Sequence, residues 1–170
     1  MACPLTQGFI LDCKESVGGI KSVRFVEFDN VVQPLTYTAG VATIVMDAGK
    51  KFWKYEQVRE TSSFTETITA NVQNGTIFYS QELTVILNKL AAATRNEILL
   101  LAKNRLMAIV EDMNGAFWLL GAKNGLDITG GNSATGTASG DRNGYTLTFT
   151  AMEADPMWSV ASGAIAALTN

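Results

Sequence analysis

The side chains of this 170-residue chain best suited to acid–base chemistry are carboxylates, because the chain contains no histidine. This removes the commonest general base, the commonest transition-metal ligand and the usual partner of a nucleophilic Ser or Cys. Glu111 and Asp112 are adjacent, but they end a predicted hairpin strand, where acidic residues are normally solvated. Glu66 shares a strand face with Phe64 and Ile68, so a half-buried carboxylate used in a subunit contact is the more natural interpretation. We find no catalytic constellation and expect the protein not to be an enzyme.

Cofactor and metal sites are also not expected. The glycine-rich stretch 129–136 lacks the Lys-Ser/Thr pair and the following helix that a phosphate-binding loop requires. Asp127, Asn132 and Asp141 do not have the dense alternation of a calcium loop. Cys3 and Cys13 are the only cysteines, and reduced, structurally incidental thiols are favoured, although a disulfide between them stays open.

Composition favours a protein that contacts other subunits. Charged residues make up 17% of the chain and hydrophobic residues 47%, and this charged share is low for a soluble protein. A single well-filled core is the alternative explanation. The net charge of −3 and the lack of a basic patch argue against a groove specific for DNA or RNA. We see no signal peptide, and the longest apolar run, 98–102, is too short to cross a bilayer, so a soluble, reducing compartment is expected.

The elements that would position these residues are mostly strands. The dipeptide Asn-Gly, which suits tight hairpin turns, occurs at 74–75, 114–115, 124–125 and 143–144. Each is a candidate point at which the chain folds back between two strands. The sequence predicts strands at 20–28, 64–72, 76–87, 105–120 (as a hairpin) and 145–153, with a short strand around 126–128 and an edge at 157–160. One domain is expected over 1–160, followed by a mobile tail at 161–170.

A hairpin formed by 41–46 and 52–58, with the polar tip Asp47–Lys50, is predicted to be an exposed arm. Trp53 lies among lysines, and an apolar arm without a core of its own is typically an interface element. We expect the substitution Trp53→Asp to leave a folded monomer that stacks poorly. The residues assigned to this contact arm are Val41, Met46, Lys51, Phe52, Trp53 and Tyr55.

A single helix is predicted at 88–103, where alanine and leucine dominate and Gly and Pro are absent. Its apolar stripe carries no ligand residues, so the helix is expected to lie across a sheet. The predicted fold class is therefore mainly β with one α-helix (α+β): an antiparallel β-sandwich or partial barrel flanked by a single helix.

Over roughly its last 100 residues the chain resembles a known family. The order from residue 61 to 160 is strand, Asn-Gly turn, long strand, helix, Asn-Gly hairpin, Gly/Thr loop and a final strand that ends in Glu-x-x-Pro. The most telling stretches are IVEDMNGAFWLLGAKNGLDITGG, TGTASGDRNGYTLTFTAMEADP and AATRNEILLLAK. They look like the tail tube proteins of tailed bacteriophages, in particular those of phages that infect Bacteroidetes.

This resemblance implies a structural virion protein. Its subunits would join their sheets into rings, usually hexamers, that stack into a tube through which DNA passes without specific binding. The expected partners are further copies and other tail proteins (a terminator, a baseplate or tip, and a sheath if the tail is contractile), with no small-molecule substrate. The expected location is the phage tail, after synthesis in the bacterial host cytoplasm.

Other functions stay open. Within virions they are a tail terminator, a neck adaptor ring, or the tube of a phage-derived injection system. From another class, a monomeric β-barrel that binds a ligand would need a cavity lined by aromatics with a few polar anchors. An enzyme is the least favoured alternative.

Overall fold

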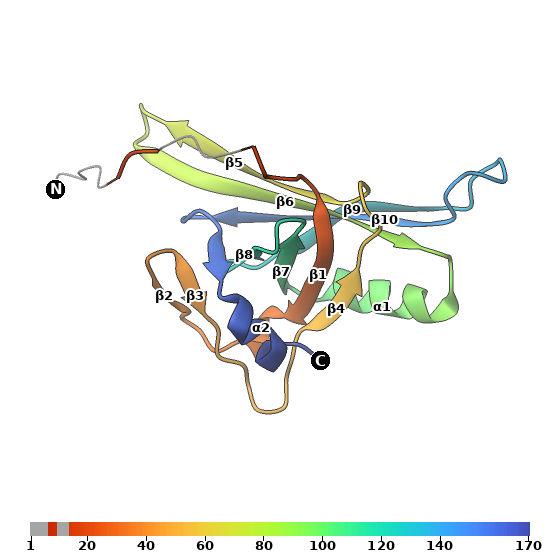
Figure 1. The fold of residues 1–170 in the computed structure, drawn as a ribbon, viewed down its shortest axis with the longest axis horizontal. Coiled ribbons are helices and arrows are strands. Elements are labelled where there is room, and N and C mark those ends of the chain that lie inside the picture. Colours follow the sequence, from red (N-terminus) through yellow and green to blue (C-terminus); the bar gives the residue numbers. More distant parts are fainter. Residues whose placement is uncertain (1–6, 10–13) are drawn as a thin grey trace.

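The computed structural model describes residues 7–9 and 14–170, so Cys3 and Cys13 lie outside the described residues. Two sheets pack face to face, and a C-terminal helix covers the far side of the larger one (Figure 1). The mainly β, α+β prediction is confirmed. The prediction of a single helix is wrong, because the described chain has two α-helices: α1 (Ala92–Lys103) and α2 (Ser162–Leu168).

The larger sheet has seven strands in the order β2-β3-β11-β8-β7-β1-β4. All its pairs are antiparallel except β3 with β11. The strands are β1 (Ile20–Glu27), β2 (Thr36–Thr38), β3 (Val41–Thr43), β4 (Trp53–Glu56), β7 (Leu106–Asp112), β8 (Phe117–Leu120) and β11 (Trp158–Val160), and a short 3-10 helix (Phe28–Asn30) follows β1.

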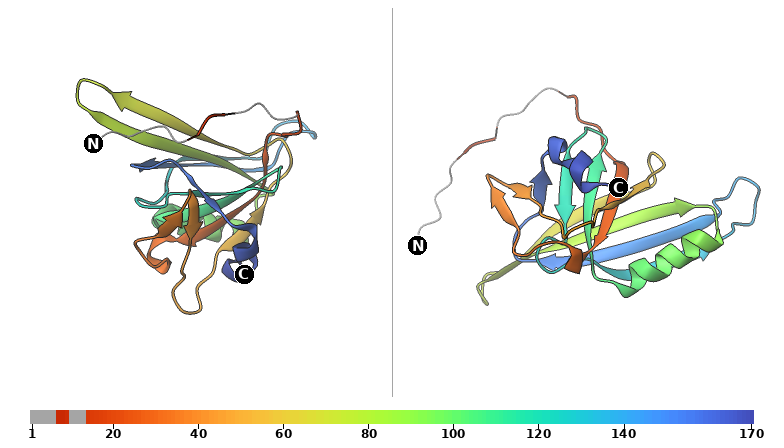
Figure 2. Two further views of the ribbon diagram at one scale, coloured as in Figure 1. Left: turned by 60° about the vertical axis from the view of Figure 1, so that its left-hand side comes forward. Right: turned by 90° about the horizontal axis from the view of Figure 1, so that it is seen from below.

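The smaller sheet has four antiparallel strands in the order β5-β6-β10-β9. They are β5 (Ser63–Asn71), β6 (Thr76–Asn88), β9 (Asp127–Ala134) and β10 (Gly144–Glu153). Its β5–β6 hairpin reaches well beyond the body of the molecule (Figures 1 and 2).

Burial on both faces of the seven-stranded sheet explains its sequence. Val23 and Phe25 in β1 point toward the four-stranded sheet and pack with Phe149 of β10, whereas Val26 points toward the core beneath α2. In β7 every residue from Leu106 to Glu111 is buried, so this strand appears in the sequence as a continuous apolar run without alternation.

The four Asn-Gly sites have different structural roles. Asn74-Gly75 and Asn114-Gly115 lie in the predicted hairpin turns, between β5 and β6 and between β7 and β8. At Asn124-Gly125 the chain instead crosses from one sheet to the other. Gly144 begins β10, and a Cβ atom there would lie 2.2 Å from the carbonyl oxygen of Leu87. This glycine is therefore required by the close approach of β6 rather than by a two-residue turn.

The prediction of a mobile tail at 161–170 is wrong. Ile165 and Leu168 of α2 are buried in the second core cluster. The backbone of Phe52 donates to the carbonyl of Leu168 and accepts from the amide of Asn170. The C-terminus is thus held by both side chains and backbone.

Removing residues 162–170 is expected to lower the free energy of unfolding by about 3–6 kcal/mol, from the loss of two buried aliphatic side chains. Urea unfolding of the truncated chain would measure the loss. A control that removes only Asn170 should retain almost all of the stability, and a truncated chain as stable as the full one would contradict the docked helix.

Candidate functional site

The six residues predicted as a contact arm do not form one surface. β3 pairs with β2 and β11, while β4 pairs with β1 at the opposite edge of the sheet. The predicted hairpin is therefore wrong, and a loop at 44–52 connects the two strands (Figure 1). Val41 and Lys51 are exposed, whereas Met46 is half-buried and bridges to Val31. The segment 44–52 does not form a hairpin arm because Phe52 is fully buried and fixes the end of the loop beneath α2.

Trp53 and Tyr55 lie together on β4, at one edge of the seven-stranded sheet. Trp53 is 58% exposed on β4, the open edge of the seven-stranded sheet. Tyr55 packs edge-on against Phe25, with ring centroids 5.5 Å apart. Both belong to a surface that the remaining four residues do not share.

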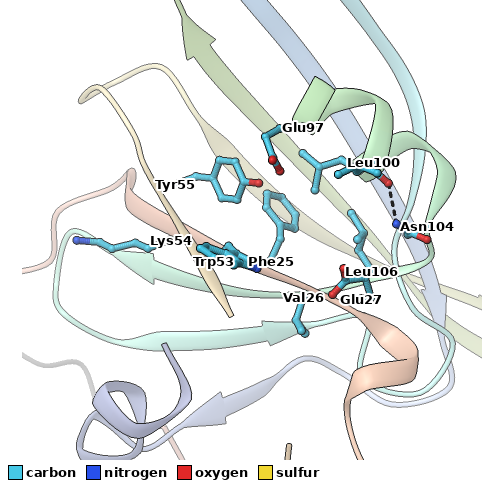
Figure 3. Close-up of a pocket in the computed structure, with 11 residues that line it drawn as sticks. Phe25, Val26, Glu27, Trp53, Lys54, Tyr55, Glu97, Leu100, Asn104 and Leu106 are labelled. Atoms are coloured by element: carbon cyan, nitrogen blue, oxygen red, sulfur yellow. Dashed lines mark hydrogen bonds between the residues drawn. The ribbon is translucent and has the colours of Figure 1, made fainter. Parts of the chain in front are cut away.

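A groove of about 460 Å³ separates β4 from α1 (Figure 3). Apolar side chains, among them Phe25, Trp53, Tyr55 and Leu100, form its walls. The other lining residues are Val26, Glu27, Lys54, Glu97, Leu101, Asn104 and Leu106. Burial, helped by the two carboxylates, raises the pKa of Tyr55 to about 12. The Tyr55 phenol is therefore neutral at neutral pH and adds a polar hydroxyl group to the apolar wall of the groove.

Among residues 7–9 and 14–170, no strand pairs with the outer edge of β5 or β9, so both edges of the four-stranded sheet are open in the described part of the chain. β5 and β9 each have a neighbour on one side only, and neither strand contains proline, lysine or arginine, the residues that usually protect an edge. Successive strands alternate in direction across β5, β6, β10 and β9. In a head-to-tail continuation, β9 of one copy would therefore run antiparallel to β5 of the next.

The strands of this sheet are regularly staggered. The strand pairing places the middle of each strand opposite a residue of β6. The middle of β5 lies opposite residue 80, the middle of β6 itself is residue 82, and the middles of β10 and β9 lie level with about residues 83–84 and 85. If the sheet continued into a closed ring with the same stagger, about 3.3 Å per residue and about 4.8 Å between strands would incline its strands by about 45–50° from the ring axis. Closed barrels have strand tilts of about 35–45°.

The outer face of the four-stranded sheet is rich in hydroxyl groups and also carries Phe78, Ile86 and Met152. Side chains alternate between the two faces along each strand. Leu83 and Phe149 are buried and point toward the core, so the residues directly before and after each of them point outward. The outward threonines, none of them buried, are Thr65, Thr67, Thr69, Thr76, Thr84, Thr146, Thr148 and Thr150. The four strands contain no lysine or arginine, and Glu82 and Asp127 are the acidic residues on this face. In the sequence, the alternating threonines at 65–69 and 146–150 already indicate that one face of this sheet is rich in hydroxyl groups.

Glu111, expected to be solvated, is buried. It accepts hydrogen bonds from Lys21 Nζ at 2.6 Å, Ser22 Oγ at 2.8 Å and Arg24 Nη2 at 2.9 Å. Burial alone would raise the pKa of Glu111, but these hydrogen bonds outweigh it and lower the pKa to about 2. The partners come from β1, so no local pattern in the sequence could indicate this ion-pair network, and its role is structural.

Glu66 is half-buried, as predicted. Its Oε2 accepts hydrogen bonds from Gln81 Nε2 at 2.9 Å and from the amide of Met157 at 2.7 Å. The carboxylate thus fixes the base of the β5–β6 hairpin to the segment that leads into β11. This contact lies within one chain, so Glu66 stabilises the hairpin that leaves the body at this point.

Among the described residues no group of three or more His, Cys, Asp or Glu side chains is arranged to hold a metal ion. In the same part of the chain, neither α-helix has the length and apolar character needed to span a membrane. No protein-family model, curated protein or solved structure matches this chain.

Proposed function

We propose that this protein is a tail tube subunit of a tailed bacteriophage, whose four-stranded sheets join edge to edge into a ring that stacks into a hollow tube. The observation that supports the proposal is the four-stranded sheet itself, whose two edge strands have no partner among the described residues and contain no proline, lysine or arginine, and whose strands are staggered to a degree close to that of a barrel. A heterologous contact of this kind gives a ring when its rotation closes. The protein would act as a passive conduit, without turnover, in the virion.

Six copies give a lumen of suitable size. Twenty-four strands about 4.8 Å apart and tilted by about 45° make a barrel about 50 Å across between backbones, or about 40 Å between side chains. A DNA duplex would pass through such a lumen. Three copies would give half that diameter, which is too narrow.

The outer face of the four-stranded sheet would then line the lumen. Its four strands contain no lysine or arginine, and Glu82 and Asp127 add negative charge, while Arg142, just before β10, reaches the face at one end and donates to Thr146 Oγ1 at 2.6 Å. Since counterion release on contact with lysine or arginine dominates DNA affinity, such a wall would let DNA slide without retention. An adaptor or terminator that forms one ring is the alternative with the same sheet contacts.

Negative-stain electron microscopy over a range of protein concentrations tests the proposal. Hollow tubes with a regular axial repeat are the expected result, isolated rings would favour the terminator or adaptor, and monomers at every concentration would contradict assembly. In that last case the aromatic groove between β4 and α1 becomes the candidate for ligand binding.

Trp53→Asp is expected to give folded subunits that form rings but tubes several-fold shorter, because the exposed indole of β4 would lie in the contact between rings. Thr38→Asp is a matched control, since it puts the same carboxylate on an exposed residue of β2, at the other edge of the sheet. Tube lengths measured in micrographs give the readout. Tubes of normal length from the Trp53 variant would remove Trp53 from the interface.

A further inference from the structure

The inner face of the β5–β6 hairpin is apolar where it projects beyond the body. Ile68 and Ile77 lie on the same side of the sheet as the core residues Phe64 and Leu83. Nevertheless, Ile68 is 62% exposed and Ile77 is 55% exposed, because nothing in the described chain lies beneath them. We call this surface, formed by Ile68, Ala70 and Ile77, the hairpin overhang.

A second exposed apolar surface lies on α1, at the other edge of the same sheet. Ile98 and Leu101 of α1 pack into the core between the sheets, and the helix lies against β9. Glu97 and Leu100 face the groove beside β4 (Figure 3). Successive helical residues are about 100° apart, so Leu99, which is exposed, lies on the opposite flank of the helix, toward β9. Arg95 and Ala102 share this flank.

Both surfaces lie on the inner side of the four-stranded sheet, one at the β5 edge and one at the β9 edge. A head-to-tail junction that pairs β9 of one copy with β5 of the next brings the two edges together. We propose that the hairpin overhang of one copy docks on the Leu99 flank of α1 in the neighbouring copy. This inference rests on the proposed ring and identifies the side-chain contact that would close each junction.

The hairpin overhang carries no charged side chain, since residues 67–77 contain no Asp, Glu, Lys or Arg. Glu66 is held at the base of the hairpin by Gln81 and Met157, and Glu82 points to the outer face of the sheet. On α1, Leu99 and Ala102 give the flank an apolar surface beside Arg95. The proposed junction would therefore bury two apolar surfaces that a single copy leaves exposed to water.

The test uses two variants, Ile68→Lys on the hairpin overhang and Leu99→Glu on α1, studied by analytical ultracentrifugation beside the unchanged protein. Each variant alone is expected to weaken self-association at least tenfold, because each puts a charge into an apolar contact. Both sites are exposed, so thermal unfolding should show folded subunits. Val17→Lys is the control and should associate normally, because Val17 is exposed and its backbone is hydrogen-bonded to Asn114 in the β7–β8 turn of the larger sheet.

An equimolar mixture of the two variants gives the decisive result. The Ile68→Lys copy keeps a native helix and the Leu99→Glu copy keeps a native hairpin, so the mixture can form one junction of native composition. Heterodimers should therefore appear where each variant alone stays monomeric. Two results would overturn this junction alone. In the first, the unchanged protein assembles and each variant assembles equally well. In the second, the mixture of the two variants forms no heterodimers. An unchanged protein that stays monomeric overturns the ring as well.

Discussion

Replacing Glu111 by glutamine is expected to lower the free energy of unfolding by about 3–5 kcal/mol, the usual cost of breaking a buried ion pair. The substitution keeps the size of the side chain but removes the charge opposite Arg24, whose side chain is only 7% exposed. The guanidinium would then stay buried without a counterion. Urea unfolding at neutral pH measures the loss.

Glu56→Gln is the matched control. Glu56 also pairs with a lysine, Lys54, but its side chain is 81% exposed, and surface pairs of this kind add little stability. The control should unfold almost like the unchanged protein. A Glu111 variant that unfolds like this control would show that Arg24 does not depend on the carboxylate.

Acid should reproduce part of the same loss. The pKa of Glu111 is held at about 2 in the folded chain, below its value of about 4.3 in the unfolded chain. The ionised Glu111 carboxylate therefore stabilises the folded chain fully at a pH above the pKa of the unfolded chain. This stabilisation disappears as the pH falls from about 5 to about 2. Unfolding curves across this range should fall steeply for the unchanged protein and less steeply for Glu111→Gln, and parallel slopes would contradict the assignment.

Local sequence signals were sufficient for much of the fold. The alternation around Asn74-Gly75 indicated the β5–β6 hairpin, and the run into Asn114-Gly115 indicated β7 and β8. In both cases the paired strands are adjacent in the sequence, so turn chemistry and period-2 patterning specify the pairing by themselves.

The errors share one physical cause, which is that the partner is distant in the sequence. Residues 41–46 and 52–58 are apolar and separated by a good turn, but β3 pairs in parallel with β11, more than a hundred residues later. The tail forms α2 because Phe52 and the second core cluster hold it, although its own composition is weakly apolar. The candidate site follows the same rule: the open edges of the four-stranded sheet depend on strand order, which no single segment of the sequence specifies.

The outer face of the four-stranded sheet offers a direct test of which surface would line the tube. Thr67 is exposed on β5 and points away from the core. A thiol introduced there by Thr67→Cys should react with a small maleimide and with a maleimide carrying a long polymer equally fast in the monomer. After assembly, the polymer reagent should react at least tenfold more slowly, while the small reagent is little affected. The reason is that a wall about 40 Å across admits small molecules but hinders a large coil.

Thr38→Cys is the control for this measurement. Thr38 is an exposed threonine on β2, at the edge of the seven-stranded sheet, which would face outward in the ring. With Cys3 and Cys13 replaced by serine in both proteins, the thiol at 38 should react with both reagents at rates that assembly leaves unchanged. Equal polymer labelling at 67 and 38 in assembled tubes would place the hydroxyl face outside. Slow polymer labelling at 38 instead would put the seven-stranded sheet on the lumen. Since that sheet carries Lys21 and Lys54, DNA would then pass a wall with positive charges, and the absence of lysine and arginine from the four-stranded sheet would no longer be explained by DNA passage.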